Sequence, residues 1–135
     1  QTILASYVGL AGHVQIHDWV IIGGQSGVHQ FCRVGPHAML GSNSVVNQDI
    51  PPYMLVDGNP GKPRSFNIEG LRRRGFDAER ISAIKAMHKL LYRDGLTLEQ
   101  AMAGIALLAA SHPAAQGDVQ TRLTALELSK RGIVR

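Results

Sequence analysis

The sequence has one cysteine, few aromatic residues and no long apolar run, and each shortage excludes a class of protein. With Cys32 alone, neither an intrachain disulfide framework nor a cysteine-rich zinc site is possible. Aromatic residues make up 5% of the 135 residues, so the core must be built mainly from aliphatic side chains. No apolar run approaches the roughly 20 residues that a membrane-spanning helix needs.

The composition is that of a globular protein, but its charge is unevenly distributed. Hydrophobic residues make up 44% of the chain and charged residues 18%, which is typical of folded domains. Residues 1–60 carry one basic and three acidic side chains, a net charge of −2, whereas residues 61–135 carry 13 basic and 7 acidic side chains, a net charge of +6. We therefore expect two physically different parts joined near residue 60.

The first part is a six-residue repeat. A branched aliphatic residue stands at every sixth position without a gap: Leu4, Leu10, Ile16, Ile22, Val28, Val34, Leu40 and Val46. This period predicts a short strand and a tight turn per repeat, with the aliphatic side chain pointing into a three-sided prism whose coils stack about 4.8 Å apart. Small residues, which often follow the aliphatic one, would fit the corners. An ordinary β-sandwich with accidental spacing is the alternative.

Both ends of the repeat are informative. Eight repeats make fewer than three coils, and the coil at the Gln1 end would have an unpaired edge, so we expect further coils to precede Gln1. At the other end, three prolines within residues 51–60 interrupt the repeat and stiffen the departing chain. We therefore expect a parallel β-helix over residues 1–63 and a helical domain over residues 64–135.

The second part shows three amphipathic helical patterns. The first is capped by Asp77, and the second begins at a capping box over residues 97–100 and ends before Pro113. The third extends from near Asp118 to Gly132. Each pattern has an apolar stripe along one face, so the three helices are expected to form a small bundle. The predicted fold is thus mainly β with an α-helical tail.

Three polar stretches go beyond the needs of this architecture: residues 10–14, 23–32 and 67–76. In the first two, His13 and His29 must point outward or lie at corners, because aliphatic side chains occupy the inward positions. Taken alone, each histidine is most simply explained as a solvent-exposed or interface residue. Arg72–Arg74 are most simply a solvated basic turn; as a functional group they would form an anion site, because guanidinium groups match the geometry of a diphosphate.

The string VHQFC at Val28–Cys32 and the string NIEGLRRRGF at Asn67–Phe76 are the most diagnostic parts of the sequence. Together with the hexapeptide repeat, they resemble the UDP-N-acetylglucosamine O-acyltransferases that begin lipid A synthesis in Gram-negative bacteria. The resemblance extends over the whole chain. It implies a left-handed parallel β-helix that assembles as a homotrimer in the cytoplasm, followed by a small helical bundle.

The resemblance also implies a reaction, the transfer of a 3-hydroxyacyl group from acyl carrier protein to the 3-hydroxyl of UDP-N-acetylglucosamine. Such a transfer needs a general base, a hydrogen-bond donor for the oxyanion and close positioning of the reactants. It implies no cofactor, no metal, no nucleic-acid partner and no membrane span. The net charge of +6 on the second part would suit the acidic carrier protein, and their encounter should then weaken with salt.

By the resemblance, the backbone N–H of Gly12 would donate to the oxyanion, His13 would contact the sugar and Gln30 the acyl 3-hydroxyl. The other substrate-binding residues would be Gly24 beside the substrate, His29 beside the acyl chain, and Asn67, Glu69, Arg73 and Arg74 around the nucleotide-sugar, with the arginines on its diphosphate. Ser42 would lie at the end of the acyl groove and act as a ruler of chain length.

Two departures from the family's pattern matter. The family's catalytic histidine falls in the stretch just before Gln1, so the general base is not in the chain, and we expect the 135 residues alone to be inactive. Pro60 stands where relatives often carry a histidine that helps to bind the nucleotide-sugar, which leaves the affinity at this position open.

Three other functions fit parts of the pattern. Another hexapeptide-repeat acyltransferase would share the prism, but the NIEGLRRRGF string and the three-helix tail argue against it. A metal enzyme resembling the carbonic anhydrases built on this prism would need three converging histidines, and the available ones lack the expected spacing: His13, His17, His29 and His37. A non-catalytic trimeric scaffold is the third alternative, for the isolated chain.

The position of Ser42 leads to a first prediction. In the family, a bulky residue here blocks long acyl chains and a small one admits them. We expect Ser42→Met to shift the complete enzyme towards shorter acyl donors, as measured by competition between donors of different chain length. An unchanged donor preference would contradict this role.

Overall fold

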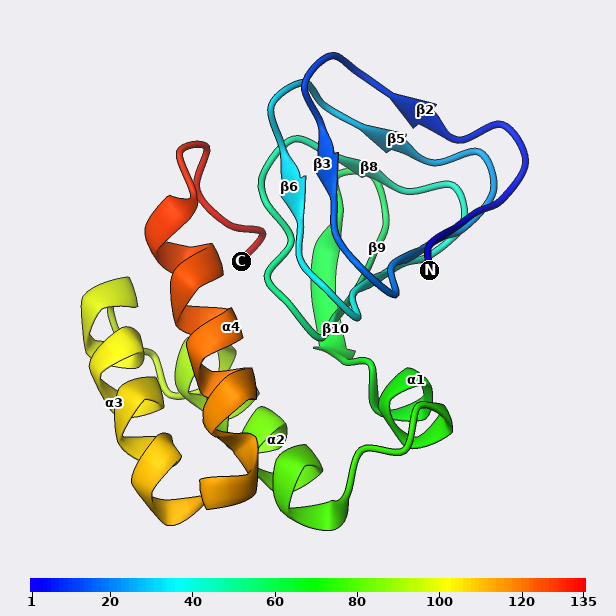
Figure 1. Ribbon diagram of the computed structural model, residues 1–135. Coiled ribbons are helices and arrows are strands. Elements are labelled where there is room, and N and C mark those ends of the chain that lie inside the picture. Colours follow the sequence, from blue (N-terminus) through cyan, green and yellow to red (C-terminus); the bar gives the residue numbers. More distant parts are fainter. The chain divides into compact units, whose positions relative to one another are not determined.

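Each repeat forms a two-residue strand and a turn in the computed structural model, which describes residues 1–135 (Figure 1). The strands are β1 (Ile3–Leu4), β2 (Gly9–Leu10), β3 (Gln15–Ile16), β4 (Ile21–Ile22), β5 (Gly27–Val28), β6 (Arg33–Val34), β7 (Met39–Leu40) and β8 (Val45–Val46). Every third strand pairs in parallel, in the orders β1–β4–β7, β2–β5–β8 and β3–β6. Residues 18 apart, such as Ile3 and Ile21, are therefore neighbours on adjacent coils. The predicted parallel solenoid is confirmed.

The aliphatic position of each repeat points into the prism, and its burial depends on the coil. From Ile22 to Val46 these side chains are at most 3% exposed. Burying an aliphatic side chain of this size contributes about 1.5–3 kcal/mol to stability. In the first coil, Leu4 and Leu10 are 47% and 39% exposed, because no coil of this chain covers them. The core of the β-helix therefore lies in its second and third coils.

The corners of the prism pass through the left-handed region of backbone conformation at non-glycine residues. The corner residues with φ between 58° and 65° are again six apart: Tyr7, His13, Trp19, Gln25, Phe31, His37 and Asn43. This conformation is unfavourable for side chains other than glycine, so the stacking of the coils must impose it. Large rings are accommodated because they stay outside the prism; Tyr7 is 85% exposed and Phe31 55%.

Small residues are required at a different part of the corners, where one coil packs directly on the next. A Cβ atom on Gly23 would lie 2.5 Å from the backbone nitrogen of Ser42, and a Cβ atom on Gly35 would lie 2.5 Å from the backbone nitrogen of Pro52. Neither distance is tolerable without movement of the backbone. The expectation that corners need small residues is therefore correct for these positions and wrong for the left-handed ones.

A hairpin ends the solenoid. Strand β9 (Met54–Asp57) pairs in parallel with β7 and in antiparallel fashion with β10 (Lys62–Phe66), which extends the first sheet to the order β1–β4–β7–β9–β10. Asp57 and Arg64 form an ion pair across the hairpin. The boundary expected after residue 63 falls inside β10, because the prolines interrupt the repeat without ending the sheet.

The last seven residues of the chain return to the β-helix. The backbone N–H of Asp49 donates to the carbonyl of Gly132 (2.9 Å), and that of Val134 donates to the carbonyl of Asp49 (2.8 Å). The carboxylate of Asp49, which is 4% exposed, also accepts the hydroxyl of Ser129 (2.5 Å) and the N–H of Arg33 (2.8 Å). One compact unit thus consists of residues 1–67 and 129–135, and the other of residues 68–128.

The second unit contains the helices. They are α1 (Ile68–Arg73), α2 (Ala78–Tyr92), α3 (Leu98–Ser111), the 3₁₀ helix η1 (Pro113–Ala115) and α4 (Gln116–Leu128). The caps are as predicted: Asp77 accepts the N–H of Arg80, and Thr97 forms the capping box with Gln100. The third predicted helix ends at Leu128 instead of Gly132, and α1 was not predicted. None of these helices combines the length and apolar character needed to span a membrane.

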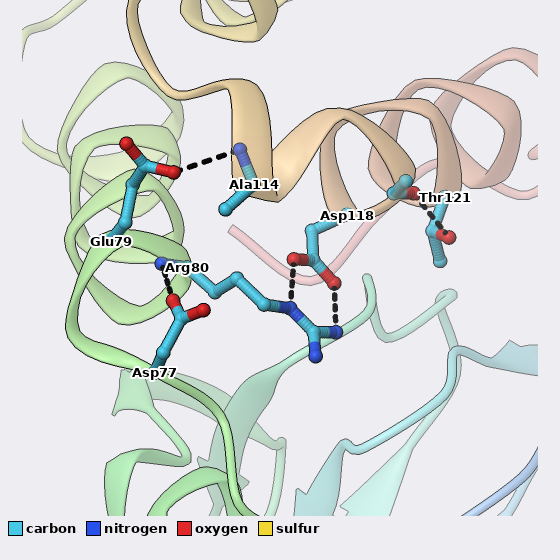
Figure 2. Close-up of polar contacts among 7 residues, drawn as sticks. Asp77, Glu79, Arg80, Ala114, Asp118 and Thr121 are labelled. Carbon is cyan, nitrogen blue, oxygen red and sulfur yellow. Dashed lines mark hydrogen bonds and ion pairs between the residues drawn. The ribbon is translucent and has the colours of Figure 1, made fainter.

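Polar contacts tie the start of α2 to the segment that contains η1 and α4, as Figure 2 shows. The guanidinium of Arg80 donates to both carboxylate oxygens of Asp118, at 2.8 and 2.9 Å. Glu79 accepts the backbone N–H of Ala114 at 2.8 Å. The Arg80 guanidinium also lies 3.7 Å from the ring centroid of Phe76, a cation–π geometry. Because the Asp118 side chain is only 6% exposed, this pairing satisfies a charge that would otherwise be costly to bury.

His88, in α2, gives this unit a pH-dependent stability. Burial lowers the pKa of its imidazole below the ordinary value of 6.5, and the charges of Arg122 and Arg93 lower it further. At pH values between this lowered pKa and 6.5, the unfolded chain binds more protons than the folded chain. The contribution of His88 to the free energy of unfolding is therefore complete above pH 6.5 and is lost as the pH falls through this range. We expect His88→Gln to reduce this loss, measured as urea midpoints by far-UV circular dichroism at several pH values. An unchanged pH dependence in the variant would contradict the assignment.

The packing of the coils predicts different effects on stability for two glycine substitutions. Gly35→Ala places a methyl group against the backbone of Pro52 and should lower the free energy of unfolding by about 2 kcal/mol. Gly27→Ala is the matched control. Its new Cβ atom would have nothing within 4 Å, so this substitution should leave the free energy of unfolding unchanged. Urea denaturation followed by the fluorescence of Trp19, the one tryptophan, measures both. Equal midpoints for the two variants would show that coil packing does not limit position 35.

Candidate functional site

Four of the residues assigned by the resemblance meet at one corner of the prism. This corner follows β2 in the first coil and β5 in the second, and we call residues 11–13 and 29–31 the histidine corner. Phe31 donates its backbone N–H to the carbonyl of Gly12 (3.0 Å), which places the two segments directly on one another. Because equivalent positions are 18 apart, Gln30 lies one coil from Gly12. The structure thus brings Gly12, His13, His29 and Gln30 together.

His13 is held by a ring that the sequence reasoning did not single out. Its imidazole is stacked on the phenyl ring of Phe31, with centroids 4.9 Å apart and planes inclined by 2°. Both residues have a positive φ, so their side chains leave the corner in the same direction. The stack fixes the plane of an otherwise exposed imidazole. The signal in the sequence was the 18-residue spacing between positions 13 and 31, one full coil.

Gly12 offers an available hydrogen-bond donor. Its backbone N–H donates to no backbone acceptor in the chain, and the residue is exposed. A Cβ atom at this position would have nothing within 4 Å, so the surface beside the Gly12 Cα atom is open. An exposed N–H beside two polar side chains can bind a carbonyl oxygen or an oxyanion.

An apolar groove of about 460 Å³ lies on the β2–β5–β8 face, beside the histidine corner. Its lining residues come from three coils: Gly9, Leu10, Ala11, Gly27, Val28, His29, Val45, Val46 and Asn47. His29 belongs to both the groove and the corner, so the polar and apolar surfaces are continuous. This arrangement suits a ligand with a polar end and an apolar tail.

Gly24 and Ser42 lie at the other edge of the same face, at the corner between β4 and β5 and its equivalent one coil on. Asn43 donates its N–H to the carbonyl of Gly24 (2.9 Å), so the two segments stack directly. A Cβ atom on Gly24 would lie 3.2 Å from the carbonyl oxygen of Ser6, which makes the position tight. Neither residue lines the groove.

The third polar stretch is divided between the two units. Asn67, 6% exposed, ends the first unit; its side-chain amide donates to the carbonyl of His37 (3.1 Å) and its N–H to that of Tyr53 (2.7 Å). The remaining members belong to the helical unit and are exposed or half-buried: Glu69, Arg72, Arg73 and Arg74. Here the sequence reasoning expected a basic turn, but two of the arginines close α1.

The charges in this stretch have distinct surroundings. Glu69 forms an exposed ion pair with Arg72 (3.6 Å), which contributes little to stability. Burial lowers the pKa of the Arg74 guanidinium, which is half-buried just after α1. As for metals, the chain has no group of three or more His, Cys, Asp or Glu side chains that could hold an ion.

The fold defines the class of the protein as a hexapeptide-repeat protein built on a left-handed parallel β-helix, the fold of its structural relatives. The chain belongs to the UDP-N-acetylglucosamine O-acyltransferase family. The family model described as "Udp N-acetylglucosamine O-acyltransferase; Domain 2" matches residues 49–134.

Individual relatives agree with this assignment. An acyl-[acyl-carrier-protein]–UDP-N-acetylglucosamine O-acyltransferase of Verminephrobacter eiseniae is 56% identical over all 135 residues, which cover 52% of that protein. The same enzyme of Thiobacillus denitrificans is 50% identical, with 51% of its length covered. The crystal structure of the Moraxella catarrhalis enzyme superposes with a TM-score of 0.93 at 40% identity, over 99% of this chain and 51% of that one. The chain therefore spans about half the length of the relatives it matches.

Proposed function

We propose that this chain forms substrate-binding surfaces of an acyltransferase that moves a 3-hydroxyacyl chain from acyl carrier protein to the 3-hydroxyl of UDP-N-acetylglucosamine in lipid A synthesis. The observation that carries the proposal is the continuity of a polar corner and an apolar groove at His29. An acyl thioester has the matching form, a polar reacting end on an apolar chain. The names of the relatives, which include both substrates, support the same conclusion.

In this proposal, the sugar 3-hydroxyl attacks the thioester carbonyl and its proton passes to a general base. The C–S bond then breaks, and the base returns the proton to the departing thiolate of the carrier protein. The exposed N–H of Gly12 stabilises the oxyanion that forms on the carbonyl oxygen. His13, held by Phe31, contacts the sugar, and Gln30 binds the acyl 3-hydroxyl one coil further on. The residues of this chain would thus bind and orient the reactants and stabilise the oxyanion, and none of them is assigned the role of general base.

The nucleotide-sugar would be held by the third polar stretch. Arg73 and Arg74 can each present a planar fork of donors to a diphosphate, and Glu69 can accept hydroxyl groups. Asn67 would act from a fixed position, because its amide is anchored on His37. Pro60 lies in the turn between β9 and β10 and offers no ionisable group at a position where, by the resemblance, relatives often carry a histidine.

The proposed setting is a homotrimer in the cytoplasm, with each site in a cleft between neighbouring prisms. The outward position of the histidine corner and the groove supports this, since a second prism could close the open side of each. The net charge of +6 on residues 61–135 supports an electrostatic attraction to an acidic carrier protein, whose association rate should fall with ionic strength.

Gln30 provides the test of the proposal. In the complete natural protein, Gln30→Ala should lower kcat/KM about tenfold for 3-hydroxyacyl donors and leave donors without the 3-hydroxyl nearly unchanged, because one hydrogen bond is lost. Gln48→Ala is the matched control: Gln48 is also exposed and lies at the equivalent position of the next coil. Both are measured by acyl transfer from loaded acyl carrier protein to UDP-N-acetylglucosamine.

Two results would contradict the proposal. Equal losses with both kinds of donor would show that Gln30 does not recognise the 3-hydroxyl. Absence of transfer by the unaltered natural protein, with either donor, would overturn the proposed reaction itself.

A further inference from the structure

The chain leaves the second-coil part of the histidine corner at a hydrogen bond to a side chain. In the first coil, the strand that follows this corner begins at Gln15, whose N–H donates to the backbone carbonyl of Cys32 one coil on (3.0 Å). The equivalent N–H in the second coil, that of Arg33, donates to the carboxylate of Asp49 (2.8 Å). Asp49 thus takes the place of a backbone acceptor at the end of the corner.

A shortened third coil explains this exchange of acceptors. Val34 pairs with Ile50, 16 positions on, whereas the pairs between the first and second coils lie 18 apart. The carbonyl of Ile50 consequently accepts the N–H of Gly35 (2.9 Å) and not that of Arg33. The shorter coil therefore displaces the backbone acceptor, and the carboxylate of Asp49 restores the hydrogen bond to Arg33.

The returning segment, residues 129–135, holds Asp49 in place. The hydroxyl of Ser129 donates to the second carboxylate oxygen (2.5 Å). The backbone of Asp49 is bonded on both sides, to the carbonyl of Gly132 and to the N–H of Val134. Asp49 and Val134 are each 4% exposed, so the segment is packed against the coil as well as hydrogen-bonded to it. The carboxylate is therefore fixed through both of its oxygens.

Both ends of the second-coil part of the histidine corner are thus anchored on the third coil. At its start, the N–H of His29 donates to the carbonyl of Val46 (2.9 Å), and beyond its end Arg33 donates to Asp49. Gln30, whose side chain is exposed, lies between these two anchors. Because so short a segment is held at both ends, the direction of the Gln30 side chain depends on both anchors.

We propose that Asp49 is a positioning residue for the acyl donor: held by the returning segment, it fixes the end of the histidine corner and thereby directs Gln30 towards the acyl 3-hydroxyl. This inference rests on the proposed function, in which Gln30 binds that hydroxyl. Asp49 acts only through the backbone of Arg33. Loss of its carboxylate would remove a charged acceptor, and a shift of about 1 Å in the corner is enough to impair binding of the donor.

The test measures how strongly the complete natural protein discriminates between two donors. The value of kcat/KM is determined for acyl carrier protein loaded with a 3-hydroxyacyl chain and with the same chain lacking the 3-hydroxyl. Asp49→Leu removes both acceptor oxygens and should lower the ratio of the two values about tenfold, as loss of the Gln30 hydrogen bond itself would. Asp49→Asn keeps an oxygen that can accept the Arg33 N–H and should keep most of the ratio.

A double-mutant cycle separates positioning from a general loss of stability. In the Gln30→Ala background, Asp49→Leu should lower the ratio no further, because the side chain that it positions is gone. Asp118→Leu is the matched control, since Asp118 is likewise 4% exposed and accepts hydrogen bonds at both oxygens, but lies in the helical unit. It should leave the ratio unchanged, because an unfolded fraction lowers the rates with both donors equally.

A milder variant tests the same anchor should Asp49→Leu fail to fold. Ser129→Ala removes the hydroxyl that donates to Asp49 and leaves the bond to Arg33 in place. It should lower the ratio about threefold, because one of the two bonds that fix the carboxylate is lost. Circular dichroism verifies the folded state of each variant.

The outcomes distinguish this inference from the proposed function. If Gln30→Ala abolishes the preference for the 3-hydroxyacyl donor but Asp49→Leu, or Ser129→Ala in its place, retains it, the positioning role is overturned and the proposed function stands. A further loss in the double variant also overturns the positioning role. If Gln30→Ala leaves the preference intact, the roles of Gln30 and Asp49 are both wrong. If the unaltered protein transfers neither acyl chain, the proposed function falls as well.

Discussion

The stacking of each coil on the coil before it is the constraint on which the rest of the β-helix depends. A strand of two residues cannot persist alone, but here it is paired with equivalent strands above or below it. Bonds such as that from the N–H of Gly9 to the carbonyl of Ser26 (2.9 Å) recur around each coil. These bonds hold the corner residues in the left-handed conformation, which is otherwise unfavourable for bulky residues. Burial of the aliphatic side chains inside the prism supplies the stabilising free energy.

The same stacking builds the candidate site. It turns residues 18 apart in the sequence into neighbours, so that short strings from two coils combine into one surface. The pair of Gly12 and Gln30 and the pair of His13 and Phe31 arise in this way. The neighbouring column of Gly9, Gly27 and Val45 lies in the apolar groove, which places an apolar surface next to a polar corner. A solenoid is suited to a long amphipathic ligand because each coil adds one increment of length.

The two units are stabilised by different means. The β-helix relies on stacked backbone bonds, and Asp49 adds a buried carboxylate that joins Arg33, Ser129 and the returning chain end. The helical unit relies on caps and on the pairing of Arg80 with Asp118. Charged groups are therefore structural in the interior of both units. Arg73, by contrast, is exposed on the surface of the helical unit.

Local patterns were enough to determine much of this protein from its sequence. The six-residue period specified the strands and the inward side chains, because one residue per side of the prism must point inward. Asp77 and the capping box at Thr97 were predictable because a helix cap depends only on residues three apart. Four residues of the histidine corner were also singled out from the sequence, through the resemblance carried by their strings: Gly12, His13, His29 and Gln30.

Only the tertiary structure decided the features that depend on distant contacts. The return of residues 129–135 to Asp49 joins positions about 80 apart, and no local pattern indicates it. The stack of Phe31 on His13 and the open groove are likewise products of coil stacking. The glycines show this difference between sequence and tertiary structure. Gly23 and Gly27 are the same residue type, and the local sequence gives them no distinct role. The backbone of the next coil lies against Gly23, so glycine is required there for packing. Nothing lies over Gly27, so glycine there only shapes the surface.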